Sequence, residues 1–64
     1  MPLVEIHLLE GRSPEQKKVL LQAVTQAVQE SLGAPLETIR VWIQEMPAAE
    51  FMSAGILAAD RDKH

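Results

Sequence analysis

A helix signature lies between two segments of alternating hydropathy, and this order constrains the fold more than any other feature. Residues 2–9 and residues 39–44 each place apolar side chains at every second position. A period of two is typical of a strand with one buried face. The apolar positions are Val4, Ile6 and Leu8 in the first segment and Ile39, Val41 and Ile43 in the second. Two strands joined by a helix form a β-α-β unit, in which the crossover is right-handed and the strands are parallel.

The helix between the two strands is predicted to run from Pro14 to Leu32. Ser13 is a favoured N-cap, Pro14 suits the first helical position, and Gln16 completes a capping box. Gly33 is typical of the residue that follows a helix end. The side chains expected to cover the sheet are Leu20, Ala23, Val24, Ala27, Ser31 and Leu32.

The C-terminal part predicts a small hairpin. Pro47 ends the second strand, and a bend at Gly55 follows Phe51 and Met52. The charged tail, residues 60–64, is expected to fray. We therefore predict an α+β fold over residues 1–64 as a single domain: a β-α-β unit with two parallel strands, one long helix and a short C-terminal hairpin.

Length and composition predict an oligomer. A chain of 64 residues buries only about 60% of the surface that its unfolded form exposes, so a lone core is marginal. Small folds then depend on disulfides, a metal or self-association. The chain has no cysteine, and His7 and His64 lack the spacing of a zinc site. One helix can cover only one face of a parallel sheet, whereas such sheets are normally covered on both. We expect a homo-oligomer without metal.

Charge and hydropathy exclude several classes of function. The net charge of −3 argues against nucleic acid, because phosphate binding requires a basic face. No apolar run is long enough to span a membrane, and no secretion signal is visible at the N-terminus. A cytoplasmic protein is therefore expected.

Four scattered residues would meet only in an oligomer. Pro2 starts the first strand and Arg12 follows its end, so the two lie on the order of 25 Å apart in one chain. Antiparallel pairing of the first strand with its own copy would bring Arg12 of a second subunit to Pro2. Phe51 lies at the same end as Arg12, and Arg40 at the same end as Pro2.

Their combined chemistry favours proton transfer. Removal of Met1 would give Pro2 a free secondary amine, and an apolar wall of Leu9, Phe51 or Trp42 would lower its affinity for a proton, as would nearby arginines. Arginine stays protonated and cannot itself be the base. A base poised near neutral pH suits proton transfer at carbon or at an enol oxygen. Guanidinium groups bind carboxylates and can stabilise a developing oxyanion.

The run from Pro2 to Ser13, which includes HLLEGRS, closely resembles the 4-oxalocrotonate (2-hydroxymuconate) tautomerase family. Residues 15–17, 32–35, 40–41 and 45–46, and then Phe51, keep that family's order and spacing, so the resemblance extends through Leu57. It implies a cofactor-independent isomerase of aromatic-compound catabolism, assembled as a homohexamer of three dimers.

The resemblance also implies roles for individual residues. Pro2 would shuttle a proton between the 2-hydroxyl oxygen and C-5 of 2-hydroxymuconate. Arg12 would bind the distal carboxylate, and Arg40 the carboxylate and carbonyl end. Phe51 would supply an apolar wall, and Leu9 would line the pocket.

The chain departs from the family at two places. Only one glycine remains in the segment Met52–Ile56, and Trp42 replaces a smaller aliphatic residue, where it could narrow the pocket or fill an interface. Arg40 could instead pair with Glu5 on the neighbouring strand. Two other functions stay open: hydration or dehalogenation of a short unsaturated acid, with Glu50 as the candidate to activate water, and a non-enzymatic oligomeric module.

Overall fold

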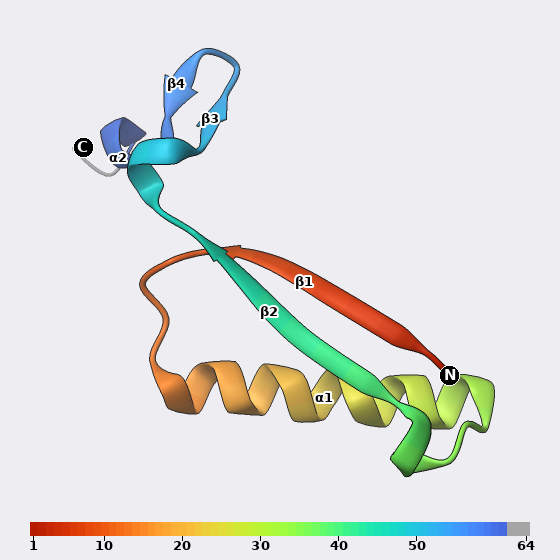
Figure 1. Ribbon diagram of the computed structural model, residues 1–64. Coiled ribbons are helices and arrows are strands. Elements are labelled where there is room, and N and C mark those ends of the chain that lie inside the picture. Colours follow the sequence, from red (N-terminus) through yellow and green to blue (C-terminus); the bar gives the residue numbers. More distant parts are fainter. Residues whose placement is uncertain (62–64) are drawn as a thin grey trace.

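The computed structural model describes residues 1–61, which form a β-α-β unit followed by a small C-terminal lobe (Figure 1). The chain passes through β1 (Leu3–Leu9), α1 (Pro14–Leu32), β2 (Arg40–Met46), β3 (Met52–Ser53), β4 (Ile56–Leu57) and α2 (Ala58–Arg61). Two 3-10 turns, η1 (Leu36–Thr38) and η2 (Ala48–Glu50), precede and follow β2. The predicted fold class is confirmed.

Strands β1 and β2 pair in parallel, with Leu3 opposite Arg40 and Leu9 opposite Met46. Strand β2 starts one residue later than predicted, because the Ile39 amide donates to the Leu36 carbonyl and closes η1 instead. It also extends two residues further than the apolar alternation indicated. The apolar alternation breaks at Glu45, a polar residue that lies on the helix-facing side of β2. The hydropathy pattern therefore ends before the strand does.

Helix α1 begins and ends as predicted, and its capping box is formed. The Gln16 amide donates to Ser13 Oγ, and the Ser13 amide donates to Gln16 Oε1, each over 3.1 Å. Gly33 follows the helix with φ 67°, and its amide donates to the Gln29 carbonyl.

The predicted apolar stripe of α1 is only partly right. Leu20 and Val24 are half-buried, as predicted. Leu21 and Val28 are half-buried as well, although the predicted stripe omits them. The other members of the predicted stripe are exposed: Ala23, Ala27, Ser31 and Leu32. The helix has 19 residues and is about 28 Å long, whereas seven-residue strands span roughly 23 Å. The last helical turn therefore extends past the sheet, and Leu32 stays 69% exposed.

The C-terminal lobe, residues 47–61, lies beyond one end of the sheet and away from most of α1 (Figure 1). Strands β3 and β4 pair in antiparallel fashion, which confirms the predicted hairpin. Asp60 and Arg61 belong to α2, and Arg61 Nη2 donates to the Ser53 carbonyl over 2.8 Å. The expectation of a frayed tail is wrong for these two residues, because this hydrogen bond ties α2 to the hairpin. Residues 62–64 lie outside the described residues.

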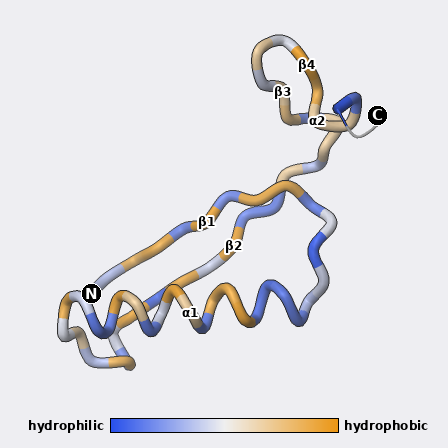
Figure 2. Tube along the Cα trace, turned by 180° about the vertical axis from the view of Figure 1, so that it is seen from behind, coloured by the Kyte–Doolittle hydropathy of each residue, from blue (hydrophilic) through white to orange (hydrophobic). Residues whose placement is uncertain are grey.

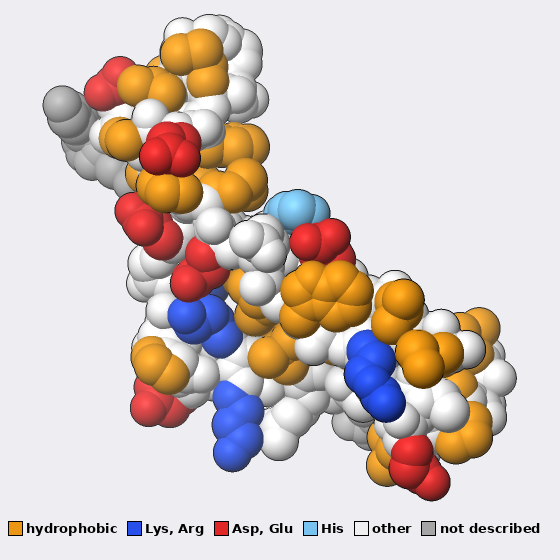
Figure 3. All heavy atoms as spheres, in the orientation of Figure 1, with side chains coloured by type: hydrophobic (Ala, Val, Ile, Leu, Met, Phe, Trp, Pro, Cys, Tyr) orange, Lys and Arg blue, Asp and Glu red, His pale blue; other side chains and the backbone are white. Residues whose placement is uncertain are grey.

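The chain is too open to form an ordinary core alone. Its radius of gyration is 14.9 Å, whereas a compact chain of this length would have about 11 Å. Within residues 1–61, only Ile39 and Ala58 are buried apolar residues. Hydrophobic residues recur along both strands and along much of α1, whereas the loop before α1 is hydrophilic (Figure 2). Apolar side chains also stay on the surface over the sheet and the C-terminal lobe (Figure 3).

None of the helices within residues 1–61 is long and apolar enough to cross a membrane.

Candidate active site

Pro2 and Arg40 lie together at one end of the sheet. The Arg40 amide donates to the Pro2 carbonyl over 3.0 Å, immediately before the paired residues Leu3 and Arg40. Pro2 itself is half-buried. The predicted proximity of these two residues is confirmed, and we call them the first half-site.

The Arg40 side chain points to η1 and not to Glu5. Its Nη1 donates to the carbonyl oxygens of Glu37 and Ile39. Glu5 lies opposite Trp42 in the sheet, and its carboxylate is 3.8 Å from His7 Nε2. The alternative ion pair between Arg40 and Glu5 is therefore not formed. Within residues 1–61 no carboxylate neutralises the Arg40 charge.

Leu9, Arg12 and Phe51 lie toward the opposite end of the sheet, and we call them the second half-site. Gly11, with φ 125°, allows the chain to turn away from β1. Arg12 follows on this loop, exposed and without a hydrogen bond or ion pair in the described part of the chain. Leu9 and Phe51 are each 37% exposed.

One chain does not unite the two half-sites. The N-terminus lies beside the last turns of α1, whereas the loop that carries Arg12 leads into its first turn (Figure 1). Seven residues of β1 separate the ends by roughly 23 Å. The structure thus brings Pro2 to Arg40, but not to Arg12, Leu9 or Phe51.

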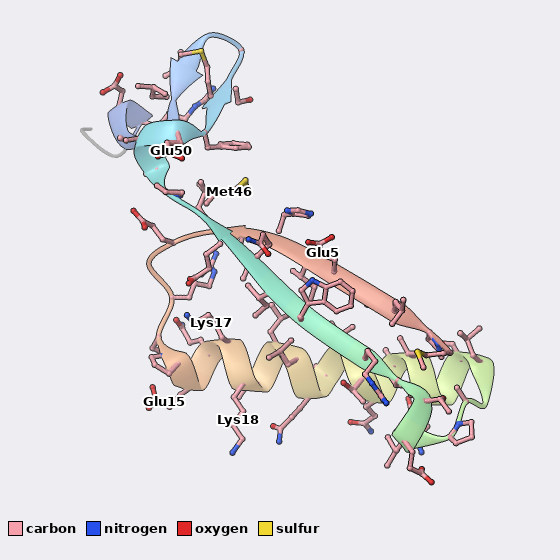
Figure 4. The ribbon with its side chains drawn as sticks, viewed as in Figure 1. Glu5, Glu15, Lys17, Lys18, Met46 and Glu50 are labelled. Atoms are coloured by element: carbon pink, nitrogen blue, oxygen red, sulfur yellow. The ribbon has the colours of Figure 1, made fainter. Side chains whose placement is uncertain are left out.

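The two half-site arginines differ from Lys17, whose charge is paired with a carboxylate. Lys17 points toward the sheet, where its Nζ bonds Glu45 Oε1 over 3.2 Å, whereas Lys18 points away (Figure 4). Arg61 donates to the Ser53 carbonyl. Arg12 and Arg40 thus keep positive charge that no described carboxylate balances, which suits an acidic ligand.

Trp42 lies on the sheet face opposite α1, two residues after Arg40, and is 39% exposed.

A hollow between α1 and η1 contains none of the five residues of the two half-sites. It is lined by Lys18, Leu21, Gln22, Thr25, Gln26, Gln29 and Leu36. Residues 1–61 contain no group of three side chains able to hold a metal ion.

The parallel β-α-β unit, with Pro2 and Arg40 side by side at one end of its sheet, defines a class of small β-α-β protein whose candidate chemistry is proton transfer. The family model described as "Tautomerase enzyme" matches residues 2–61. The chain belongs to the tautomerase family, and it is an isomerase of the 2-hydroxymuconate tautomerase type.

Several relatives are similar over almost their whole length. The chain is 45% identical over 60 residues to a 2-hydroxymuconate tautomerase of Comamonas testosteroni, covering 94% of this chain and 95% of the relative. It is 51% identical over 55 residues to one of Stutzerimonas stutzeri, covering 86% and 87%. These similarities confirm the family that the sequence predicted.

Solved structures agree with the fold. The crystal structure of TomN, a 4-oxalocrotonate tautomerase homologue in the tomaymycin biosynthetic pathway, superposes with a TM-score of 0.92 at 40% identity, covering 98% of this chain and 97% of that one. A heterohexameric 4-oxalocrotonate tautomerase from Chloroflexus aurantiacus gives 0.89 at 40% identity, covering 94% and 97%.

Proposed function

We propose that this isomerase converts 2-hydroxymuconate, or a closely similar unsaturated dicarboxylate, to its 2-oxo tautomer, with Pro2 as the general base. The observation that carries the proposal is the pair of arginines without carboxylate partners, one in each half-site. Two cations at opposite ends of a pocket suit a substrate with a carboxylate at each end. Relatives at 45% and 51% identity are named for this substrate.

The proposed reaction moves one proton. The neutral Pro2 amine takes the proton of the 2-hydroxyl group, and the oxygen's electron pair forms the carbonyl at C-2. The conjugated double bonds shift, and the protonated amine returns the proton to C-5. Atoms and electrons balance without a co-reactant, and the base is regenerated.

The other candidate residues support these steps. Arg40 binds the carboxylate next to C-2 and stabilises negative charge on the oxygen. Arg12 binds the distal carboxylate. Leu9 and Phe51 form an apolar wall that favours the uncharged amine. The mechanism requires removal of Met1, because an amide nitrogen has no useful basicity.

We further propose that a second copy completes each site. Within residues 1–61, β1 pairs with β2 on one edge only, so its other edge can pair with another strand. Antiparallel pairing of two full β1 strands places the two-fold axis at Ile6, the middle residue of the strand. Arg12 and Leu9 of one copy then lie beside Pro2 of the other. Three such dimers would give the homohexamer, and a cytoplasmic role in aromatic catabolism completes the proposal.

The test is the rate of 2-hydroxymuconate ketonisation, followed by ultraviolet absorbance, on protein whose intact mass shows that Met1 is absent. The control is the Pro2→Ala variant, prepared in the same way. A high kcat/KM that falls by a factor of about 10² or more in the variant supports the proposal. A background rate in both proteins would overturn it, and would favour hydration of an unsaturated acid or a non-enzymatic oligomer.

A further inference from the structure

The Arg40 guanidinium is held by the turn that precedes its own strand. Its Nη1 donates to the carbonyl oxygens of Glu37, inside η1, and Ile39, directly after it. Nη1 carries two N–H groups, enough to serve both acceptors. The Nε and Nη2 groups have no hydrogen-bond partner in the described part of the chain. One edge of the guanidinium is thus fixed to the backbone, and the other edge is open.

The turn itself is held by Thr38. Thr38 Oγ1 donates to the Pro35 carbonyl over 2.8 Å, and the Thr38 amide donates to the same oxygen over 3.0 Å. The Ile39 amide donates to Leu36 over 3.1 Å, and Ile39 is 7% exposed. The side-chain hydroxyl therefore adds a second bond to the closure of η1, directly after the residue whose carbonyl receives Arg40.

We propose that Thr38 is a positioning residue: its hydroxyl fixes η1, and η1 in turn holds Arg40 so that Nε and Nη2 face the substrate. The inference rests on the proposed function, because it assigns that open edge to the carboxylate and oxygen at C-2. An arginine held in advance loses less side-chain entropy when it forms a bidentate contact. It also stays in place as charge develops on the oxygen, which is what electrostatic stabilisation of a transition state requires.

The experiment compares Thr38→Val with Thr38→Ser, each in two backgrounds, with Arg40 intact and with Arg40→Ala. Valine keeps the branched shape and removes the hydroxyl, whereas serine keeps the hydroxyl. With Arg40 intact, we expect Thr38→Val to lower kcat/KM about three- to tenfold, the range for loss of one hydrogen bond. Thr38→Ser keeps kcat/KM within about twofold of the parent.

The Arg40→Ala background separates positioning from general stability. If Thr38 acts through Arg40, Thr38→Val has no further effect on kcat/KM once the guanidinium is gone. An equal loss in both backgrounds would overturn the inference, because it would show that the hydroxyl only supports the fold. Chemical denaturation of all variants measures their stability separately.

A second readout does not depend on activity. Nitrogen-15 relaxation of the side-chain Nε is measured for Arg40 and, as a mobile reference, for exposed Arg12. We expect a high order parameter for Arg40 in the parent and in Thr38→Ser, and a lower one in Thr38→Val. An unchanged value in Thr38→Val would overturn the inference. Should the parent protein lack tautomerase activity, the proposed function fails, and this order parameter alone decides whether Thr38 holds Arg40.

Discussion

The backbone amide of Arg40 donates to the carbonyl oxygen of Pro2 over 3.0 Å, so the proposed base and the proposed oxyanion-stabilising residue are fixed to each other at the first pair of the sheet. This bond uses backbone atoms only. Substitution of either side chain therefore changes the chemistry of the first half-site while the backbone link persists.

Replacing Arg40 tests the stabilisation of charge at the C-2 oxygen. We expect Arg40→Ala to lower kcat about 10²- to 10³-fold, the usual cost of losing one such donor. Arg40→Lys restores only part of the rate, because an ammonium cannot make the planar bidentate contact. Steady-state kinetics on 2-hydroxymuconate gives both values. The control is Lys18→Ala, which removes an exposed cation that points away from the sheet; an equal loss of kcat in that variant would contradict the assignment.

The separation of the two half-sites predicts complementation between inactive subunits. Pro2→Ala and Arg12→Ala each damage every site of their own homo-oligomer. A mixed dimer, however, has one site with both residues intact and one with neither. Random mixing in equal amounts makes half of the dimers mixed, so about a quarter of all sites regain both groups. The measurement is kcat/KM after the two variants are unfolded together and refolded.

The control for complementation is each variant refolded alone, at the same total concentration. Activity of the mixture above the mean of the two controls requires that Pro2 and Arg12 of one site come from different chains. A mixture no more active than that mean would contradict the shared site.

The sequence predicted most of the fold because its signals are local. Alternation identified β1 and β2, and the cap at Ser13 with the glycine at Gly33 identified both ends of α1. Prediction from the sequence failed where tertiary contacts override the local pattern. Glu45 occupies an inward position because Lys17 reaches it from α1. Asp60 and Arg61 are helical because Arg61 donates a hydrogen bond to the hairpin.

The candidate site was predicted less completely. The positions of Pro2 and Arg40 followed from the parallel register, and the distance to Arg12 followed from strand length. The contact of Arg40 with η1 could not be foreseen, because its acceptors are backbone carbonyl oxygens, which every residue has. Thr38 therefore carried no sequence signal of its own.

The capping box predicts a stability effect at the start of α1. Ser13→Ala removes the acceptor for the Gln16 amide, and we expect a loss of about 1 kcal/mol per chain. Ser31→Ala is the matched control, because Ser31 is exposed in the same helix and its replacement is expected to stay within about 0.5 kcal/mol. Denaturant unfolding at one fixed protein concentration measures both, since the stability of an oligomer depends on concentration. Equal losses in the two variants would contradict a specific role for the cap.

The hairpin turn predicts that one substitution stabilises the protein. Ala54 and Gly55 form the turn between β3 and β4 with φ values of 54° and 79°, as in the two-residue turns that join antiparallel strands. A left-handed conformation costs a residue with a Cβ roughly 1–2 kcal/mol, and glycine avoids this cost but loses more chain entropy on folding. We expect Ala54→Gly to raise the free energy of unfolding by about 0.5–1 kcal/mol per chain. The control is Ala49→Gly in η2, where φ is not positive and glycine is expected to destabilise by a similar amount. Denaturant unfolding of both variants at equal concentration checks the opposite signs, and a loss of stability in both would show that the left-handed turn at Ala54 carries no strain.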